Sequence, residues 1–230
     1  MGRVRPQSGL QQVAAQRLAT TAASQAAAPP RSAAAWEALW APYDAGTYES
    51  VLGQMRPADI VLDIGAGDLR LARQMARRAA HVYALEQQAG LVATQLGTLP
   101  DNLTLLVGDA RRLAFPAEVT IAVLLMRHCR HFALYRQKLA ETNCRTFMTN
   151  ARWGMGVESI QLKQPPRPFQ AVELGWYACR CGATGFKPGA PAALTAAVEA
   201  HTHEVASCPH CDGDLLLAHS PINTVREPQW

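Results

Sequence analysis

The sequence lacks two features that would place it in common functional classes. No apolar run in its 230 residues approaches the ~20 residues that a membrane-spanning helix needs. Acidic residues are absent before Glu37, so residues 1–35 carry the whole formal net charge of +4 through four arginines, Arg3, Arg5, Arg17 and Arg31. We therefore expect a soluble protein with no membrane partner. The pI of about 8.8 reflects this N-terminal stretch and does not indicate a basic nucleic-acid-binding domain.

Residues 1–35 are also poor in large apolar side chains and rich in Ala, Gln, Ser and Thr. Such a composition buries little surface, which predicts a flexible basic tail. An arginine-containing, acid-free N-terminus is typical of organellar transit peptides, but the Ala/Arg bias of the whole chain explains it equally well. We expect a cytoplasmic protein, with an organelle as the alternative if this stretch is a transit peptide.

Strand and helix patterns alternate from residue 36 to about residue 150. After a helical stretch (36–55), expected strands at 60–64, 81–86, 103–107, 119–126 and 145–149 are interleaved with expected helices at 69–80, 88–96 and 131–142. This alternation predicts right-handed βαβ units around a mostly parallel sheet with helices on both faces. The chain is thus expected to be α/β, with a domain over residues 36–165 and a small second unit over residues 166–230 that follows a proline-rich linker.

The turn after the first expected strand is built for close approach of a ligand. It reads VLDIGAGD (61–68), in which Gly65, Ala66 and Gly67 let the backbone turn sharply before a helix N-terminus. Glu86 ends the second strand, where a carboxylate can accept hydrogen bonds from both hydroxyls of a ribose. Asp109, followed by Ala110, comes after the third strand. Three acids at the ends of consecutive strands, counting Asp63, predict a nucleoside-containing cofactor.

A nicotinamide dinucleotide is the competing cofactor, and it would require Gly-x-Gly-x-x-Gly. The last position of that pattern is Arg70 here, so the glycine that allows close helix–strand packing beside a pyrophosphate is missing. A cofactor without a pyrophosphate is therefore favoured.

The set formed by Asp63-x-Gly65-x-Gly67, Glu86 and Gly108-Asp109 resembles the first three motifs of Rossmann-like S-adenosylmethionine-dependent methyltransferases. Residues 43–110 are most similar to the ribosomal RNA adenine dimethyltransferase group. The resemblance implies the fold of that class and S-adenosyl-L-methionine as cofactor. It implies that residues 65–67 lie under the methionine part, Glu86 by the ribose, and Asp109 with Ala110 by the adenine. The chain has Leu69 where the class often has a further glycine.

The part of the sequence expected to bind the methyl acceptor differs from that group. Adenine-N6 enzymes carry an Asn/Asp-Pro-Pro-aromatic or Asn-Leu/Ile-Pro-aromatic turn after the fourth strand, and this chain has MRHCRHF (126–132) instead. Adenine dimethylation is therefore not inferred. Cations are expected at this edge, namely Arg111, Arg127, His128, Arg130, His131 and Arg152. We predict an anionic acceptor, most readily RNA, with Arg127 and His128 as the catalytic candidates and His128 as a possible general base. Ordinary surface charges and a helix-capping His131 are the alternative.

Four of the six cysteines form two close pairs near the C-terminus, Cys179/Cys181 and Cys208/Cys211. Two thiolate pairs on separate turns supply the ligands of a tetrahedral structural Zn²⁺ site, and the pattern is similar to zinc ribbons. The first pair is one residue shorter than the usual Cys-x-x-Cys, so His201, His203 or His210 could replace one thiolate. Two disulfides are the alternative, but they require an oxidising compartment.

Three functions remain open at this point. The first is methyl transfer to RNA, the second is methyl transfer to a small anionic metabolite, and the third is a non-catalytic RNA- or protein-binding module that keeps the cofactor pocket. The sequence does not indicate an oligomeric state.

Overall fold

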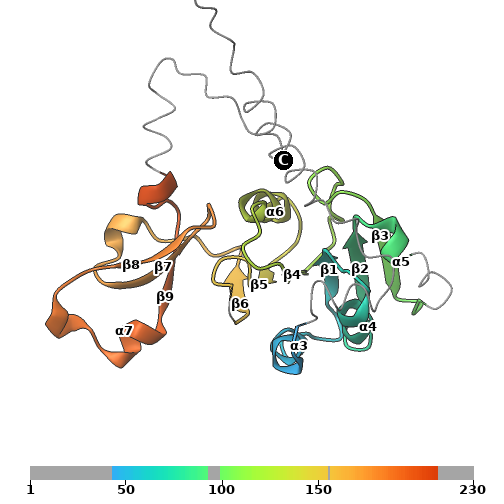
Figure 1. Cartoon of the computed structure of the whole chain (residues 1–230), viewed down its shortest axis with the longest axis horizontal. Coiled ribbons are helices and arrows are strands. Elements are labelled where there is room, and N and C mark those ends of the chain that lie inside the picture. The colour runs from blue at the N-terminus through green and yellow to red at the C-terminus, as the bar shows by residue number, and fades with distance from the viewer. Residues whose placement is uncertain (1–42, 93–98, 155, 212–230) are drawn as a thin grey trace, which may run out of the picture. The chain divides into compact units, whose positions relative to one another are not determined.

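The structure is a computed structural model that describes residues 43–92, 99–154 and 156–211. These residues form one six-stranded and one three-stranded sheet, with short helices beside them (Figure 1). The large sheet contains β1 (Ile60–Ile64), β2 (His81–Glu86), β3 (Leu103–Val107), β4 (Ile121–Leu124), β5 (Thr146–Thr149) and β6 (Glu158–Gln161). Its helices are α3 (Ala45–Leu52), α4 (Arg70–Ala76), α5 (Ala89–Val92) and α6 (Phe132–Ala140).

The large sheet has the strand order β3-β2-β1-β4-β5-β6. Strands β1 to β5 are parallel, whereas β6 runs antiparallel to β5. This arrangement confirms the expected α/β fold with a mostly parallel sheet. The strand order reverses at β1, which lies between β2 and β4. In open α/β sheets, ligands bind at the carboxyl ends of the strands near such a reversal.

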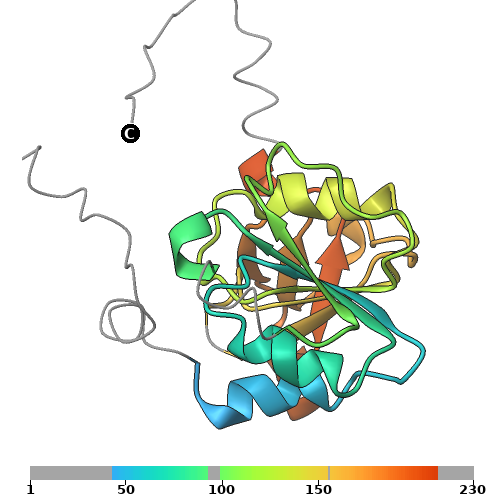
Figure 2. The same cartoon turned by 90° about the vertical axis from the view of Figure 1, so that its right-hand side faces the viewer.

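Helices cover both faces of the large sheet because its strands are apolar on both sides (Figure 2). On one face, Val61 and Val123 pack with buried residues of α3 and α4 such as Leu52 and Met75. On the other face, alternate strand residues pack with Phe132, Tyr135 and Leu139 of α6. The two-sided burial explains why β4 reads as a continuous apolar run in the sequence.

Some expected elements differ from those observed. Helix α4 ends at Ala76, before the expected residue 80, and α6 spans Phe132–Ala140 within the expected 131–142. Strand β6 was not expected, since the sequence pattern weakens after Gly154. Only Ile160 of β6 is buried, so the strand has little periodic signal and is held by its pairing with β5. The basic tail, residues 36–42 and the end of the expected helix at 88–96 lie outside the described residues.

The C-terminal sheet has the order β8-β7-β9, with β7 (Gly175–Cys179), β8 (Thr184–Lys187) and β9 (Thr202–Val205). Strand β7 pairs antiparallel with β8 and parallel with β9. Short helical segments flank it: η2 (Phe169–Ala171), η3 (Pro191–Ala193) and α7 (Ala196–Ala200).

The proline-rich linker is joined to this sheet by hydrogen bonds. The Arg167 amide donates to the Glu204 carbonyl over 2.9 Å, and the Ala206 amide donates to the Arg167 carbonyl over 3.0 Å.

The predicted domain boundaries stay predictions: the one at residue 35 lies outside the described residues, and the one at residue 165 falls between β6 and β7. Among the helices of the described ranges, none is long and apolar enough to span a membrane.

Candidate functional site

The loop between β1 and α4 has the backbone conformation that its glycines predict. Gly65 and Gly67 have φ values of 77° and 58°, in the left-handed region that disfavours side chains. The amides of Gly65 and Ala66 both donate to the Leu85 carbonyl, over 2.8 and 3.0 Å, which ties the loop to β2. Leu69 also has a positive φ of 66°. This conformation explains why glycine is common at that position in the class, and burial of the leucine side chain offsets the strain.

Asp63 and Glu86 are both buried, each with 4% of its surface exposed, at the ends of neighbouring strands. The Glu86 carboxylate accepts hydrogen bonds from the amides of Gly67 (2.9 Å) and Gln88 (2.8 Å), so it fixes the loops after β1 and β2. Burial, together with the charge of Glu86, raises the pKa of Asp63 to about 7.

Two buried acceptor atoms at the carboxyl ends of β1 and β2 have no hydrogen-bond partner among the described residues. They are Oδ2 of Asp63 and Oε1 of Gln88. Leaving a buried acceptor unpaired costs on the order of 1–3 kcal/mol, and such groups in folded proteins call for an explanation. A ligand that carries donors or a positive charge would satisfy both atoms.

Asp109 lies after β3, as expected, but its carboxylate is already engaged. It accepts hydrogen bonds from the backbone amide and the guanidinium of Arg111, each at 2.9 Å. These hydrogen bonds lower the pKa of Asp109 to about 2. Arg111 therefore pairs with Asp109 rather than offering an unpaired charge to an acceptor. Ala110 is buried beside it. Their predicted contact with adenine stays a prediction.

Arg127 and His128 lie after β4, and both are exposed. The Arg127 guanidinium lies over the Tyr43 ring, 5.0 Å from its centroid. His128 has a φ of 56°, and its amide donates to the Ala151 carbonyl over 3.0 Å, which joins the loops after β4 and β5. Its ring lies against Gly154, where an added Cβ would be 2.8 Å from Nε2. His131 is the N-cap residue of α6, as the alternative interpretation had it, but its side chain makes no capping hydrogen bond.

Arg152 is not an exposed part of this edge, and the expectation that it lines the acceptor site was wrong. Its side chain is 1% exposed and donates to Glu158 over 2.7 and 2.6 Å and to Glu204 over 2.7 Å. It also donates to the Cys179 carbonyl over 3.1 Å. Arg152 is thus a buried link between the loop after β5 and the C-terminal sheet. No local sequence signal indicates this role, because both glutamates lie in elements that follow it.

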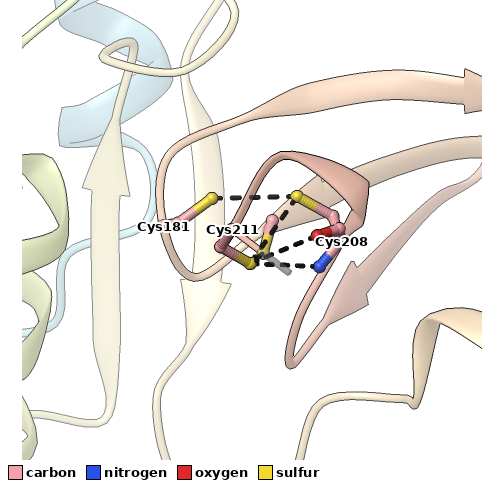
Figure 3. A group of neighbouring side chains, drawn as sticks. Cys181, Cys208 and Cys211 are labelled. Carbon is pink, nitrogen blue, oxygen red and sulfur yellow. Dashed lines mark hydrogen bonds between the residues drawn. The ribbon is translucent and has the colours of Figure 1, made fainter. Parts of the chain in front are cut away.

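The four C-terminal cysteines converge as their spacing predicts. Figure 3 shows three of them, Cys181, Cys208 and Cys211, with their sulfur atoms close together. Their sulfur atoms all lie within 4.8 Å of one another, and three of the pairs are 3.8 Å apart. All four cysteines are free thiols, which disfavours the disulfide alternative. No histidine joins the group within the described residues. His201 and His203 instead contact each other through their rings, 4.5 Å apart.

Comparison with known proteins agrees with the geometry of the first loop. Residues 62–146 match the family model described as a methyltransferase domain. A curated protein of Methanosarcina mazei, the probable ribosomal RNA small subunit methyltransferase A, is 35% identical over 77 residues. That match covers 32% of this chain, and the chain spans 28% of the relative's length.

Solved structures give weaker likenesses. The 23S rRNA methyltransferase ErmE has a TM-score of 0.40 and 21% identity, over 46% of each chain. A dimethyladenosine transferase from Plasmodium falciparum has a TM-score of 0.39 and 18% identity, over 44% of this chain and 38% of that chain. The DhpI complex with SAH has a TM-score of 0.43 and 16% identity, over 51% and 62%.

Proposed function

Because residues 62–146 form a methyltransferase domain of the Rossmann-like, S-adenosylmethionine-dependent class, we propose that this protein transfers a methyl group from S-adenosylmethionine to RNA. The observation that carries the cofactor assignment is the buried Asp63–Glu86 pair beside a loop with two left-handed glycines. The acceptor assignment rests on the exposed cations after β4 and on the name of the Methanosarcina relative.

The residues at the β1–β2 edge fit the donors of this cofactor. Its ammonium group can donate to the unpaired Oδ2 of Asp63, and its ribose hydroxyls can donate to Glu86, which has acceptor capacity beyond its two backbone partners. Gly65 and Gly67 leave the backbone bare for close approach. When bound, S-adenosylmethionine supplies a methyl group on a sulfonium, which is a good leaving group.

The chain's own contribution to transfer is then mainly positioning of the acceptor. Arg127 and His128 stand at the strand end where a substrate would approach, and Arg127 can bind a phosphate through its planar fork of donors. His128 supplies an imidazole nitrogen that can act as a general base. Its ring is held against Gly154, so its position depends on the loop after β5.

Calorimetry with S-adenosylhomocysteine tests the cofactor site. We expect binding by the wild-type chain, and a loss of at least about tenfold in affinity for Asp63→Ala and for Glu86→Ala, since each removes a charge-assisted hydrogen bond. Asp101→Ala is the matched control, because Asp101 is an exposed acid in the turn before β3. Absence of binding, or equal affinities for all four proteins, would refute the cofactor assignment.

Transfer of label from S-adenosylmethionine tests the acceptor. The full chain is incubated with total RNA, with protein and with a small-metabolite extract, and label is expected in the RNA. Arg127→Gln and His128→Gln are expected to reduce it, whereas Arg112→Gln, at an exposed arginine outside this loop, should not. Label in the metabolite fraction would identify a small metabolite, and not RNA, as the acceptor. Label in no fraction would support the non-catalytic module.

We further propose that Cys179, Cys181, Cys208 and Cys211 bind a structural Zn²⁺. Four free thiols within 4.8 Å of one another support this proposal, since four thiolates complete a closed tetrahedral site with no position left for water. Metal analysis of protein prepared without chelator should give close to one zinc per chain. Cys181→Ser should lower that content, and Cys129→Ser should not. A content well below one in the wild-type chain would refute the proposal.

A further inference from the structure

Six large apolar side chains are exposed among the described residues, and two of them are aromatic neighbours. Trp176 of β7 is 39% exposed and Phe186 of β8 is 36% exposed. They are paired across the two strands, and their ring centroids lie 5.0 Å apart at an interplanar angle of 78°. Single exposed apolar residues are common in soluble proteins. Two large rings exposed side by side are a specific feature of this surface.

This aromatic pair continues towards the candidate acceptor site. Trp153, in the loop after β5, contacts Trp176 with centroids 5.9 Å apart and an interplanar angle of 84°. The next residue is Gly154, which the His128 ring contacts. Three rings in contact therefore run from the loop after β5 to the C-terminal sheet, and the residue after the first of them lies against His128 of the loop after β4. We call Trp153, Trp176 and Phe186 the aromatic row.

The rings meet edge to face, a geometry in which one ring's edge covers another ring's face. Both Trp176 and Phe186 keep more than a third of their surface exposed to solvent in this arrangement. Open aromatic faces bind flat, unpaired bases of single-stranded nucleic acid by stacking. A docked protein helix would instead require mostly aliphatic side chains around the rings. The register places Thr184, Thr202 and Glu204 on this face of the sheet, together with Ala178.

Charge at the β4 end of the row also favours a nucleic acid. Arg127 and Arg130 are exposed, and neither makes an ion pair with a described residue. Proteins bind single-stranded nucleic acids by combining cations along the phosphate backbone with aromatic rings on which the bases stack. Arg152 is neutralised by Glu158 and Glu204 and does not contribute.

We propose that the aromatic row is a stacking platform for unpaired bases of a single-stranded RNA that extends from the acceptor site. The proposal rests on RNA as the acceptor and names the part of the chain that would hold it. It assigns the C-terminal sheet a role in substrate binding, in addition to its cysteine cluster.

The test measures binding without S-adenosylmethionine, so its outcome is independent of methyl transfer. The probe is a fluorescently labelled single-stranded oligoribonucleotide of about 12 nucleotides, with a duplex RNA of the same length as comparison. The full chain is expected to prefer the single strand. Trp176→Ala and Phe186→Ala should each weaken binding by about 5- to 100-fold, the effect of losing one stacked base. Leu194→Ala, at an exposed apolar residue outside the row, should leave affinity unchanged.

Trp176→Phe keeps an aromatic face and is expected to recover most of the affinity. The unfolding temperature of each variant is measured alongside. If all variants unfold at the same temperature, a loss of affinity in Trp176→Ala cannot be explained by a role of Trp176 in folding. Equal affinities for Trp176→Ala, Phe186→Ala and Leu194→Ala would overturn the proposal. So would equal affinity for duplex and single strand. Sedimentation showing a dimer that Trp176→Ala dissociates would instead identify a second copy of the chain as the occupant, and this too would overturn it.

Discussion

Asp63 is a buried acid held in an unfavourable state by its neighbours. Water is excluded, Glu86 adds a second negative charge, and Oδ2 has no hydrogen-bond donor among the described residues. A bound cation that carries N–H groups would balance the negative charge of the pair and supply a hydrogen-bond donor to Oδ2. Asp63 therefore favours a positively charged ligand over a neutral one. Recognition of an amino-acid ammonium group requires this preference.

The first prediction concerns the pH dependence of cofactor binding. Because the pKa of Asp63 is raised to about 7, the carboxyl is mostly neutral at pH 6 and mostly ionised at pH 8. Only the ionised form attracts an ammonium group, so the affinity for S-adenosylhomocysteine should rise about tenfold over this interval. Calorimetry at both pH values measures it. Asp63→Asn should bind weakly with no such rise, and a flat profile in the wild-type chain would contradict the assignment.

The second prediction concerns stability without ligand. The pKa of Asp63 is higher in the folded chain than the ordinary value of 3.8, so the folded state binds the proton more tightly. The contribution of this group is fully present below pH 4 and is lost as the pH rises to about 7. Asp63→Asn should therefore stabilise the ligand-free protein at pH 8 by about 4 kcal/mol, with little effect at pH 4. Denaturant unfolding at the two pH values measures this, and destabilisation at pH 8 would refute it.

Residues with local roles could be read from the sequence. Gly65, Gly67 and Glu86 act on backbone within or beside their own loop, so their position at a strand end indicates their role. Arg152 could not be read in this way. Its partners lie 6 and 52 positions later in the chain, and its position after a strand equally suggested an exposed cation.

Among the elements, strands β1 to β5 could be predicted because each is rich in apolar or β-branched residues and is followed by a turn, although only Leu103 of β3 is buried. The antiparallel β6 could not, since Ile160 is its one apolar residue and it depends on β5 for its hydrogen bonds. The meeting of Cys179/Cys181 with Cys208/Cys211 was predictable from spacing alone. The parallel pairing of β7 with β9 was not, because register between distant strands depends on packing.

The third prediction concerns the link between the two sheets. Arg152→Met keeps much of the side-chain volume but leaves Glu158 and Glu204 without their buried counter-ion. Breaking a buried pair in this way costs about 3–5 kcal/mol, and denaturant unfolding measures it. Arg112→Met is the matched control: Arg112 is 88% exposed and its nearest carboxylate oxygen is 3.9 Å away, so the change should stay within about 0.5 kcal/mol. Equal effects of the two substitutions would show that the Arg152 network does not stabilise the fold.

At the scale of the whole molecule, the two sheets differ in how much core supports them. The large sheet is covered by helices on both faces, with two extended apolar clusters. The C-terminal sheet has four buried residues in its cluster, namely Val172, Cys179, Val205 and Cys208. Two of these are proposed metal ligands. A core this small requires another source of stability, and a structural metal is one that small units commonly use.

The fourth prediction follows from this difference and concerns metal removal. A strong chelator should unfold the C-terminal sheet while the large sheet stays folded on its own core. Tryptophan fluorescence should change, because Trp176 belongs to the C-terminal sheet and contacts Trp153. Affinity for S-adenosylhomocysteine should stay within about twofold, because Asp63, Glu86 and the glycine loop belong to β1, β2 and their connection. Restored zinc should reverse the fluorescence change, and Cys181→Ser should reproduce the chelated state without chelator. Loss of cofactor affinity in parallel with zinc would show instead that the two sheets unfold as one cooperative unit.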